Sequence, residues 1–238
     1  MSLGETLDRH ASSVGRYAWW SAWFGLVMGQ MHALSRHRTE DGESDLEYPL
    51  TAAWAEPAGD ALAPLFDWAD PDLVYVTYGK IWLPVFLGFF LCAVVVHRRR
   101  QPQGFEKWAW RAVLLGYAWA VVDVAATYWT QWTGEYNALF DIAFLAGLPG
   151  MLLTLLGSTV LGVTLLVKGS RPRLAATLLA VTVPLALVIT EVTSMGSVSL
   201  SVAFAFAVLG RQLATEEGTT GAAEGTAPRQ PETAVPYV

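Results

Sequence analysis

The chain consists of long apolar runs joined by short polar stretches, a pattern typical of a protein that crosses a membrane several times. A helix that spans the hydrocarbon core needs about 20 mostly apolar residues. Runs long enough to consider cover residues 17–34, 73–96, 108–132, 138–167 and 174–210. The last run is too long for one helix, and its middle segment ITEVTSMGSVS has the Gly and Ser content of a tight turn. Dividing it into 174–192 and 197–210 predicts an all-α membrane protein, a bundle of about six transmembrane helices, with five as the alternative.

Basic residues concentrate in alternate loops and on the tails, which predicts an orientation. They are Arg9 and Arg16 before the first run, Arg98, Arg99, Arg100, Lys107 and Arg111 between the second and third, Lys168, Arg171 and Arg173 between the fourth and fifth, and Arg211 and Arg229 at the end. Only Arg36 and Arg38 fall in the loop after the first run. Because cytoplasmic loops carry the excess of Lys and Arg, both termini are predicted in the cytoplasm, and six spans are favoured over five. The protein is expected in the cytoplasmic or inner membrane, with the lipid bilayer as its partner.

The polar segments complete the predicted organisation. Residues 1–16 form a cytoplasmic N-terminal segment, 17–211 the transmembrane bundle, and 212–238 a disordered cytoplasmic tail rich in Gly, Thr, Ala, Glu and Pro. The external loop 36–72 is acidic and carries Trp and Leu among prolines. We expect it to form one or two short helices that lie on the outer surface or cap the bundle.

Composition narrows the function classes. The chain is 53% hydrophobic and 15% charged, whereas about a quarter of the residues of a soluble domain are charged. The net charge of −6 offers no basic stripe, so no nucleic-acid partner is expected. A single cysteine, Cys92, allows no intramolecular disulfide. The number of copies in an assembly is left open.

Small residues and prolines within the runs predict local features of the bundle. Pro84, Pro149 and Pro184 each remove one backbone donor and loosen a predicted helix. Gly150, Thr154, Ser158 and Gly162 recur every four residues, and this stripe predicts close packing against a neighbouring helix of the same bundle.

No cofactor or metal is predicted. His32 lies near the outer face and His97 at the inner face, so the two imidazoles cannot share a haem iron. The sequence contains no HExxH, cysteine-based, P-loop or nucleophile-elbow motif. The alternating acids of TEDGESDLE lack the spacing of a calcium loop, which favours solvated acid over a cation site.

Lys80 is the unexpected residue of the second run. It lies about 12 Å inside the outer boundary, where a cation costs roughly 2.5–3.5 kcal/mol on insertion scales. Asp123 lies about 13 Å from the same face in the third run. A short basic loop joins the two runs, so they should be antiparallel neighbours. We therefore predict a Lys80–Asp123 ion pair.

Other polar groups share the outer half, namely Gln30, His32, Tyr78, Asp141 and Glu191. The hypothesis is an outward-facing polar pocket with Lys80 and Asp123 at its floor, since an ionisable residue within a membrane is a functional candidate. The alternative is a structural salt bridge, with Asp141 and Glu191 at the membrane interface.

Three functions fit these observations. The first is binding or transport of a small polar or amphiphilic ligand, with Lys80 and Asp123 as a gate or proton-coupling pair. The second is a membrane enzyme for a lipid or isoprenoid, with Asp123, Glu191 or His32 as general acid or base. The third is a structural or accessory subunit. The sequence assigns no catalytic residue.

Overall fold

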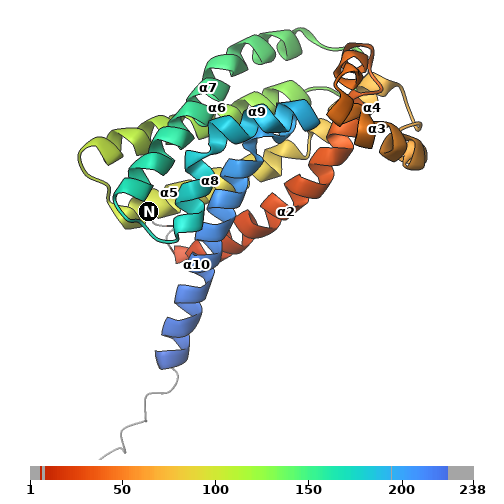
Figure 1. Ribbon diagram of the computed structural model, residues 1–238. Coiled ribbons are helices and arrows are strands. Elements are labelled where there is room, and N and C mark those ends of the chain that lie inside the picture. Colours follow the sequence, from red (N-terminus) through yellow and green to blue (C-terminus); the bar gives the residue numbers. More distant parts are fainter. Residues whose placement is uncertain (1–5, 7–8, 194, 225–238) are drawn as a thin grey trace, which may run out of the picture.

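A computed structural model of the chain describes residues 6, 9–193 and 195–224, and that part of the chain contains helices and turns but no strand. The long elements are α2 (Ala11–Arg36), α4 (Pro71–Gly79), α5 (Trp82–Arg100), α6 (Phe105–Tyr128), α7 (Ala138–Val167), α8 (Arg173–Ala180), α9 (Thr182–Val192) and α10 (Leu200–Glu224). The short helices η1 (Glu40–Glu47), α3 (Pro49–Ala61) and η2 (Ala63–Leu65) follow α2, and η3 (Met195–Ser199) precedes α10. Figure 1 shows the long helices packed into one bundle with α3 at one end.

Several of these helices suit a membrane. Among the described residues, the helical stretches 71–100, 105–128, 138–167 and 197–215 are long and apolar enough to cross one. The bent pair α8 and α9 makes a fifth if it counts as one span. The helix α2 is not among them, although it is 26 residues long, because Gly, Ser, Gln and His dilute its apolar content. The structure therefore gives an all-helical bundle with four or five candidate spans.

Two of the predicted spans are broken, and each break lies just before a proline. The chain leaves α4 at Lys80 and enters α5 at Trp82, two residues before Pro84. It leaves α8 at Val181 and turns by 64° into α9, where Pro184 is the third residue. A proline ring clashes with the carbonyl four residues earlier, which is Lys80 for Pro84 and Ala180 for Pro184. The loosening predicted at these two prolines is therefore present, whereas α7 remains one helix through Pro149.

Side chains bind the backbone groups that these breaks release. The indole Nε1 of Trp129 donates a hydrogen bond to the carbonyl of Lys80 over 3.1 Å. The backbone N–H of Val183 donates to the hydroxyl of Thr159 over 3.2 Å. Such partners are what allows broken helices at membrane depth, where water is scarce.

Small residues set the distances between helices. The stripe on α7 lies inside the bundle, as predicted, because all four of its residues are buried. The hydroxyl of Ser158 lies 2.7 Å from that of Tyr117 on α6, and Gly162 lies against the backbone of Ala180 on α8. The first and last long helices, α2 and α10, meet at Gly15 and Gly210, where a Cβ on Gly15 would lie 2.1 Å from the Gly210 carbonyl oxygen.

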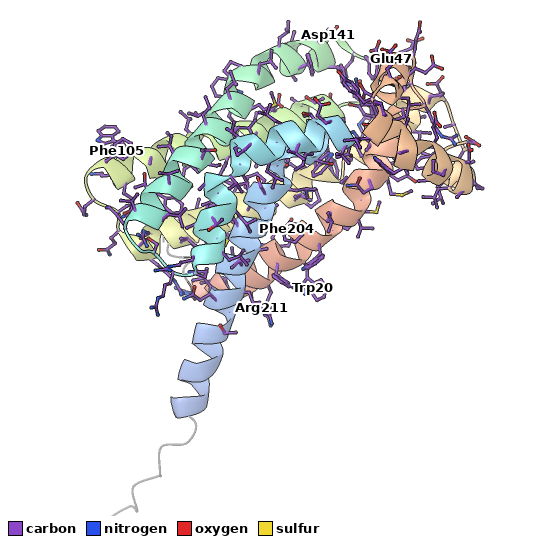
Figure 2. All side chains as sticks on the ribbon, in the orientation of Figure 1. Trp20, Glu47, Phe105, Asp141, Phe204 and Arg211 are labelled. Carbon is purple, nitrogen blue, oxygen red and sulfur yellow. The ribbon has the colours of Figure 1, made fainter. Side chains whose placement is uncertain are left out.

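Residues 37–70, which we call the cap, cover one end of the bundle. Thr51 and Trp54 of α3 donate hydrogen bonds to the carbonyls of Glu191 and Val192 at the end of α9. Arg38 bonds the side chain of Asp67 and the carbonyl of Gly59. Figure 2 shows Glu47 of the cap and Asp141 of α7 at the same end, and Phe105 at the opposite one. The predicted external segment is therefore a folded, docked layer.

Two helices extend beyond the limits that the sequence predicts for the bundle. The helix α2 begins at Ala11, so the predicted N-terminal segment 1–16 already contains its first turns. The helix α10 continues to Glu224 and leaves the bundle as one rod (Figure 1), so the tail predicted from residue 212 is helical for its first 13 residues. Residues 225–238 lie outside the described residues.

The crossing of α2 and α10 yields a stability prediction. Gly15→Ala places a methyl group inside the van der Waals radius of the Gly210 carbonyl oxygen, so the helices must separate. We expect the free energy of unfolding to fall by about 1–3 kcal/mol, measured by denaturant unfolding in detergent micelles. Gly59→Ala in the cap is the matched control, since nothing lies within 4 Å of its added Cβ. Equal stability of the two variants would contradict the close crossing.

Candidate functional site

The predicted Lys80–Asp123 ion pair is not formed. The ammonium nitrogen of Lys80 lies 3.7 Å from the centroid of the Trp132 ring, and no ion pair joins Lys80 to Asp123. The two depths were matched, but Lys80 stands at the break between α4 and α5, where a regular helix no longer fixes the direction of its side chain. A cation over an indole face gains electrostatic attraction without a carboxylate. The ammonium at this depth is therefore stabilised by an aromatic ring.

A cavity of about 640 Å³ lies between the helices beneath the cap, and Asp123 is one of its lining residues. Its walls on α6 and α7 follow helical spacing: Ala120, Asp123, Val124, Thr127 and Tyr128 on the former, and Phe140, Asp141, Phe144, Gly147, Leu148, Met151, Thr154 and Leu155 on the latter. From residue 141 to residue 155 the cavity follows α7 for about 21 Å. It is an elongated chamber that reaches from the cap into the bundle.

The cap end of the cavity is polar and the deeper part is mostly apolar. Arg36 at the end of α2 and Asp45 of η1 line it and form an ion pair of 2.8 Å. Tyr136 lines it and donates a hydrogen bond of 2.8 Å to Asp72. The pKa of Tyr136 is raised mainly by burial and next by the hydrogen bond to Asp72, so the phenol stays neutral. Farther from the cap, the cavity is lined by the apolar side chains of Phe86, Met151 and Leu155.

His32 lies in the wall of the cavity, with 1% of its surface exposed. Its ring stacks on Tyr75 at 4.8 Å and meets Tyr128 edge-on at 5.3 Å. The indole of Trp82 donates a hydrogen bond of 3.0 Å to the Nδ1 of His32. An Nδ1 that accepts places the proton of a neutral imidazole on Nε2. That Nε2 has no partner in the structure, and neither has the Oγ1 of Thr154 in the same cavity.

Asp123 lies against α7 because residue 147 is a glycine. A Cβ at Gly147 would lie 2.5 Å from one carboxylate oxygen of Asp123 and 2.7 Å from the other. The carboxylate of Asp123 makes no hydrogen bond and no ion pair with any described residue. A negative charge without a partner inside a low-dielectric bundle is costly, and such groups are associated with function.

The structure brings together three of the seven predicted site residues. His32, Asp123 and Asp141 line the cavity, whereas Lys80, Gln30, Tyr78 and Glu191 do not. Gln30 accepts a hydrogen bond from Thr193, and the hydroxyl of Tyr78 donates to the carbonyl of Leu65 in the cap. The side chain of Glu191 is exposed, and its carbonyl accepts from Thr51. The contacts of Gln30, Tyr78 and Glu191 therefore join the cap and the end of α9 to the rest of the bundle.

Sequence reasoning missed several cavity residues, above all Arg36 and the tyrosines Tyr75, Tyr128 and Tyr136. Arg36 was assigned only to the outer loop, yet it follows His32 by four residues and so shares its helix face. That spacing was a usable signal. The tyrosines carried none, because membrane-interface anchors contain the same residue type.

The side chains offer no obvious metal site. In the described part of the chain, no group of three or more His, Cys, Asp or Glu residues lies close enough together to hold a metal ion. Comparisons of the chain with protein-family models, with curated proteins and with solved structures found no match.

The hydrogen bond between Trp82 and His32 yields a second prediction. Trp82→Phe keeps an aromatic ring but leaves Nδ1 of His32 buried without a donor. We expect a loss of about 1–3 kcal/mol in the free energy of unfolding, measured in detergent micelles. Trp20→Phe is the matched control, because Trp20 is 69% exposed on the outside of α2 and should change stability little (Figure 2). A Trp82→Phe variant as stable as the control would contradict this bond.

Proposed function

We propose that this chain is a multi-span membrane protein that binds a small polar or amphiphilic ligand in the cavity beneath its cap. The cavity itself carries the proposal: about 640 Å³ is within the range of about 300–1,000 Å³ that small-molecule sites occupy. Its lining is also that of a binding site, with apolar and aromatic walls and a few polar groups at one end. The predicted gate between Lys80 and Asp123 is absent, so the proposal is limited to binding.

An amphiphile fits the cavity better than a compact polar molecule. Arg36, Asp45 and Asp141 lie at the cap end. Asp123 lies about 9 Å farther along α7, beside Gly147, and the walls toward residue 155 are largely hydrocarbon. A headgroup would therefore sit beneath the cap and a tail would extend along α7. Phe144 and Leu148 line the cavity and are also 54% and 37% exposed, so this wall is open toward the outside of the bundle. An apolar tail reaching that opening would meet lipid.

The proposal includes a topology of six spans with both termini in the cytoplasm of a cell bounded by the cytoplasmic or inner membrane. The elements concerned are α2, α4 with α5, α6, α7, α8 with α9, and α10. Arg98, Arg99, Arg100 and Lys168 lie at the end opposite the acidic cap, which is the arrangement that the positive-inside bias favours. The cavity then opens on the extracytoplasmic side.

Cysteine labelling tests this topology. Asp141→Cys and Phe105→Cys place exposed thiols at opposite ends of the bundle (Figure 2), while the native Cys92 is fully buried. A membrane-impermeant maleimide added to intact cells should label Asp141→Cys alone. Phe105→Cys should become reactive after the membrane is permeabilised. The reverse pattern would contradict the orientation, and labelling of both before permeabilisation would contradict the six-span topology.

Native mass spectrometry tests ligand binding. The protein, released from its membrane in mild detergent, should carry one amphiphile that withstands removal of loosely bound lipid. Leu148→Trp fills part of the cavity and should reduce its occupancy about tenfold or more, since tail volume is lost. Leu145→Trp is the matched control, because Leu145 lies on the same helix, is 67% exposed and does not line the cavity. Absence of a bound species, or equal occupancy of the two variants, would contradict binding in this cavity.

A further inference from the structure

We propose that the cavity selects an organic cation, an amphiphile with an amine or quaternary ammonium head, whose charge is neutralised by Asp123. This inference rests on the proposed function and narrows it to one class of ligand. It follows from the charges of the cavity, from its aromatic walls, from the spacing of its acids and from two buried polar atoms without partners.

The charges of the cavity do not balance. Its described lining holds the carboxylates of Asp41, Asp45, Asp123 and Asp141 against the single guanidinium of Arg36. That guanidinium is already paired with Asp45, so three carboxylates have no cation beside them in the lining. Asp123 is the deepest of them, because it lies against Gly147, about 9 Å farther along α7 than Asp141, and unpaired carboxylates at membrane depth are costly. A ligand that brings a positive charge removes this cost, whereas an anionic head would add to it.

Aromatic rings surround the same space. Tyr75, Tyr128 and Tyr136 stand at the polar end, and Trp82, Phe86, Phe140 and Phe144 continue the wall. Tyr136 and Phe140 stack at 4.3 Å and form one continuous aromatic surface. Ring faces attract cations, and the attraction grows where water is excluded. Carboxylates combined with ring faces are the chemistry that recognises substituted ammonium groups.

The acids are too far apart for a bare metal ion. A hard cation needs several oxygen ligands at about 2.0–2.6 Å, and no cluster of three acids or histidines close enough to supply them exists in the described residues. An organic ammonium carries its charge over several carbon atoms and needs one carboxylate and ring faces. The arrangement therefore favours an organic cation over a metal.

Two further atoms could bond an oxygen atom of the ligand. The Nε2–H of His32 and the hydroxyl of Thr154 are buried in the cavity wall without partners. A buried donor left unpaired costs about 1–3 kcal/mol, so each is expected to bond a ligand or water. A hydroxyl, ether or carbonyl oxygen in the ligand would accept from His32. The ligand class is thus an amphiphilic amine with at least one hydrogen-bond acceptor.

Two hydrophobic ions of equal shape and opposite charge test the charge preference. Tetraphenylphosphonium and tetraphenylborate are titrated against the full chain in nanodiscs of zwitterionic lipid, with empty nanodiscs subtracted. We expect the phosphonium to bind at least about tenfold more tightly than the borate. Asp123→Asn should weaken phosphonium binding by about tenfold or more, because it removes the charge and keeps the shape. Asp60→Asn, which changes an exposed acid of the cap outside the cavity, should leave it unchanged.

Each outcome is decisive. Tighter binding of the borate, or equal binding of the two ions, overturns the cation assignment, and the wild-type chain alone decides this without any variant. Undiminished phosphonium binding by Asp123→Asn overturns the role of Asp123. If neither ion binds while native mass spectrometry still finds a Leu148→Trp-sensitive amphiphile, the cation assignment fails and the proposed function stands. If that species is also absent, both fail.

Discussion

The scarcity of water inside the bundle is the constraint on which the rest of the structure depends. A polar group there must find a partner within the protein, and most do: the Lys80 carbonyl accepts from Trp129 and the Val183 amide donates to Thr159. Five buried side-chain atoms of the described residues have no hydrogen-bond partner, namely Nε2 of His32, both ring nitrogens of His37, Oγ1 of Thr154 and Oγ of Ser197. Asp123, His32 Nε2 and Thr154 Oγ1 all belong to the wall of the cavity beneath the cap. Because unmet polar groups are costly, the unpaired groups in this wall support the proposed ligand.

Much of the architecture could be predicted because hydrocarbon burial and proline geometry are local properties of a sequence. The apolar run 138–167 coincides with α7, Ala138–Val167. Pro84 and Pro184 predicted the breaks in two of the helical stretches. The stripe from Gly150 to Gly162 predicted a contact inside the bundle. The helix α2 is long enough to span a membrane, but its apolar content does not distinguish a span from a buried helix. The proposed six spans include α2, whereas apolar content alone gives four or five.

The candidate site was harder to predict because it depends on direction as well as depth. Counting residues placed Lys80 and Asp123 at the same depth. In the structure the amine of Lys80, at the break between α4 and α5, lies on the ring of Trp132. Asp123 of α6 instead lies against Gly147 of α7. His32, Asp123 and Asp141 were found because a polar residue within an apolar run is conspicuous. Arg36 and the tyrosines were missed, because they look like ordinary interface residues until the cap folds over them. Contacts between distant segments, such as Thr51 with Glu191, leave no trace in local composition.

The close crossing of α2 and α10 has a consequence for biogenesis. Gly15 and Gly210 bring the earliest and the latest of the described long helices into backbone contact. A ribosome delivers the chain in order, so Gly210 is added 195 residues after Gly15. Until then the face of α2 at Gly15 lacks the partner that covers it in the finished bundle. The contact between α2 and α10 can therefore form only after nearly the whole described chain has been made.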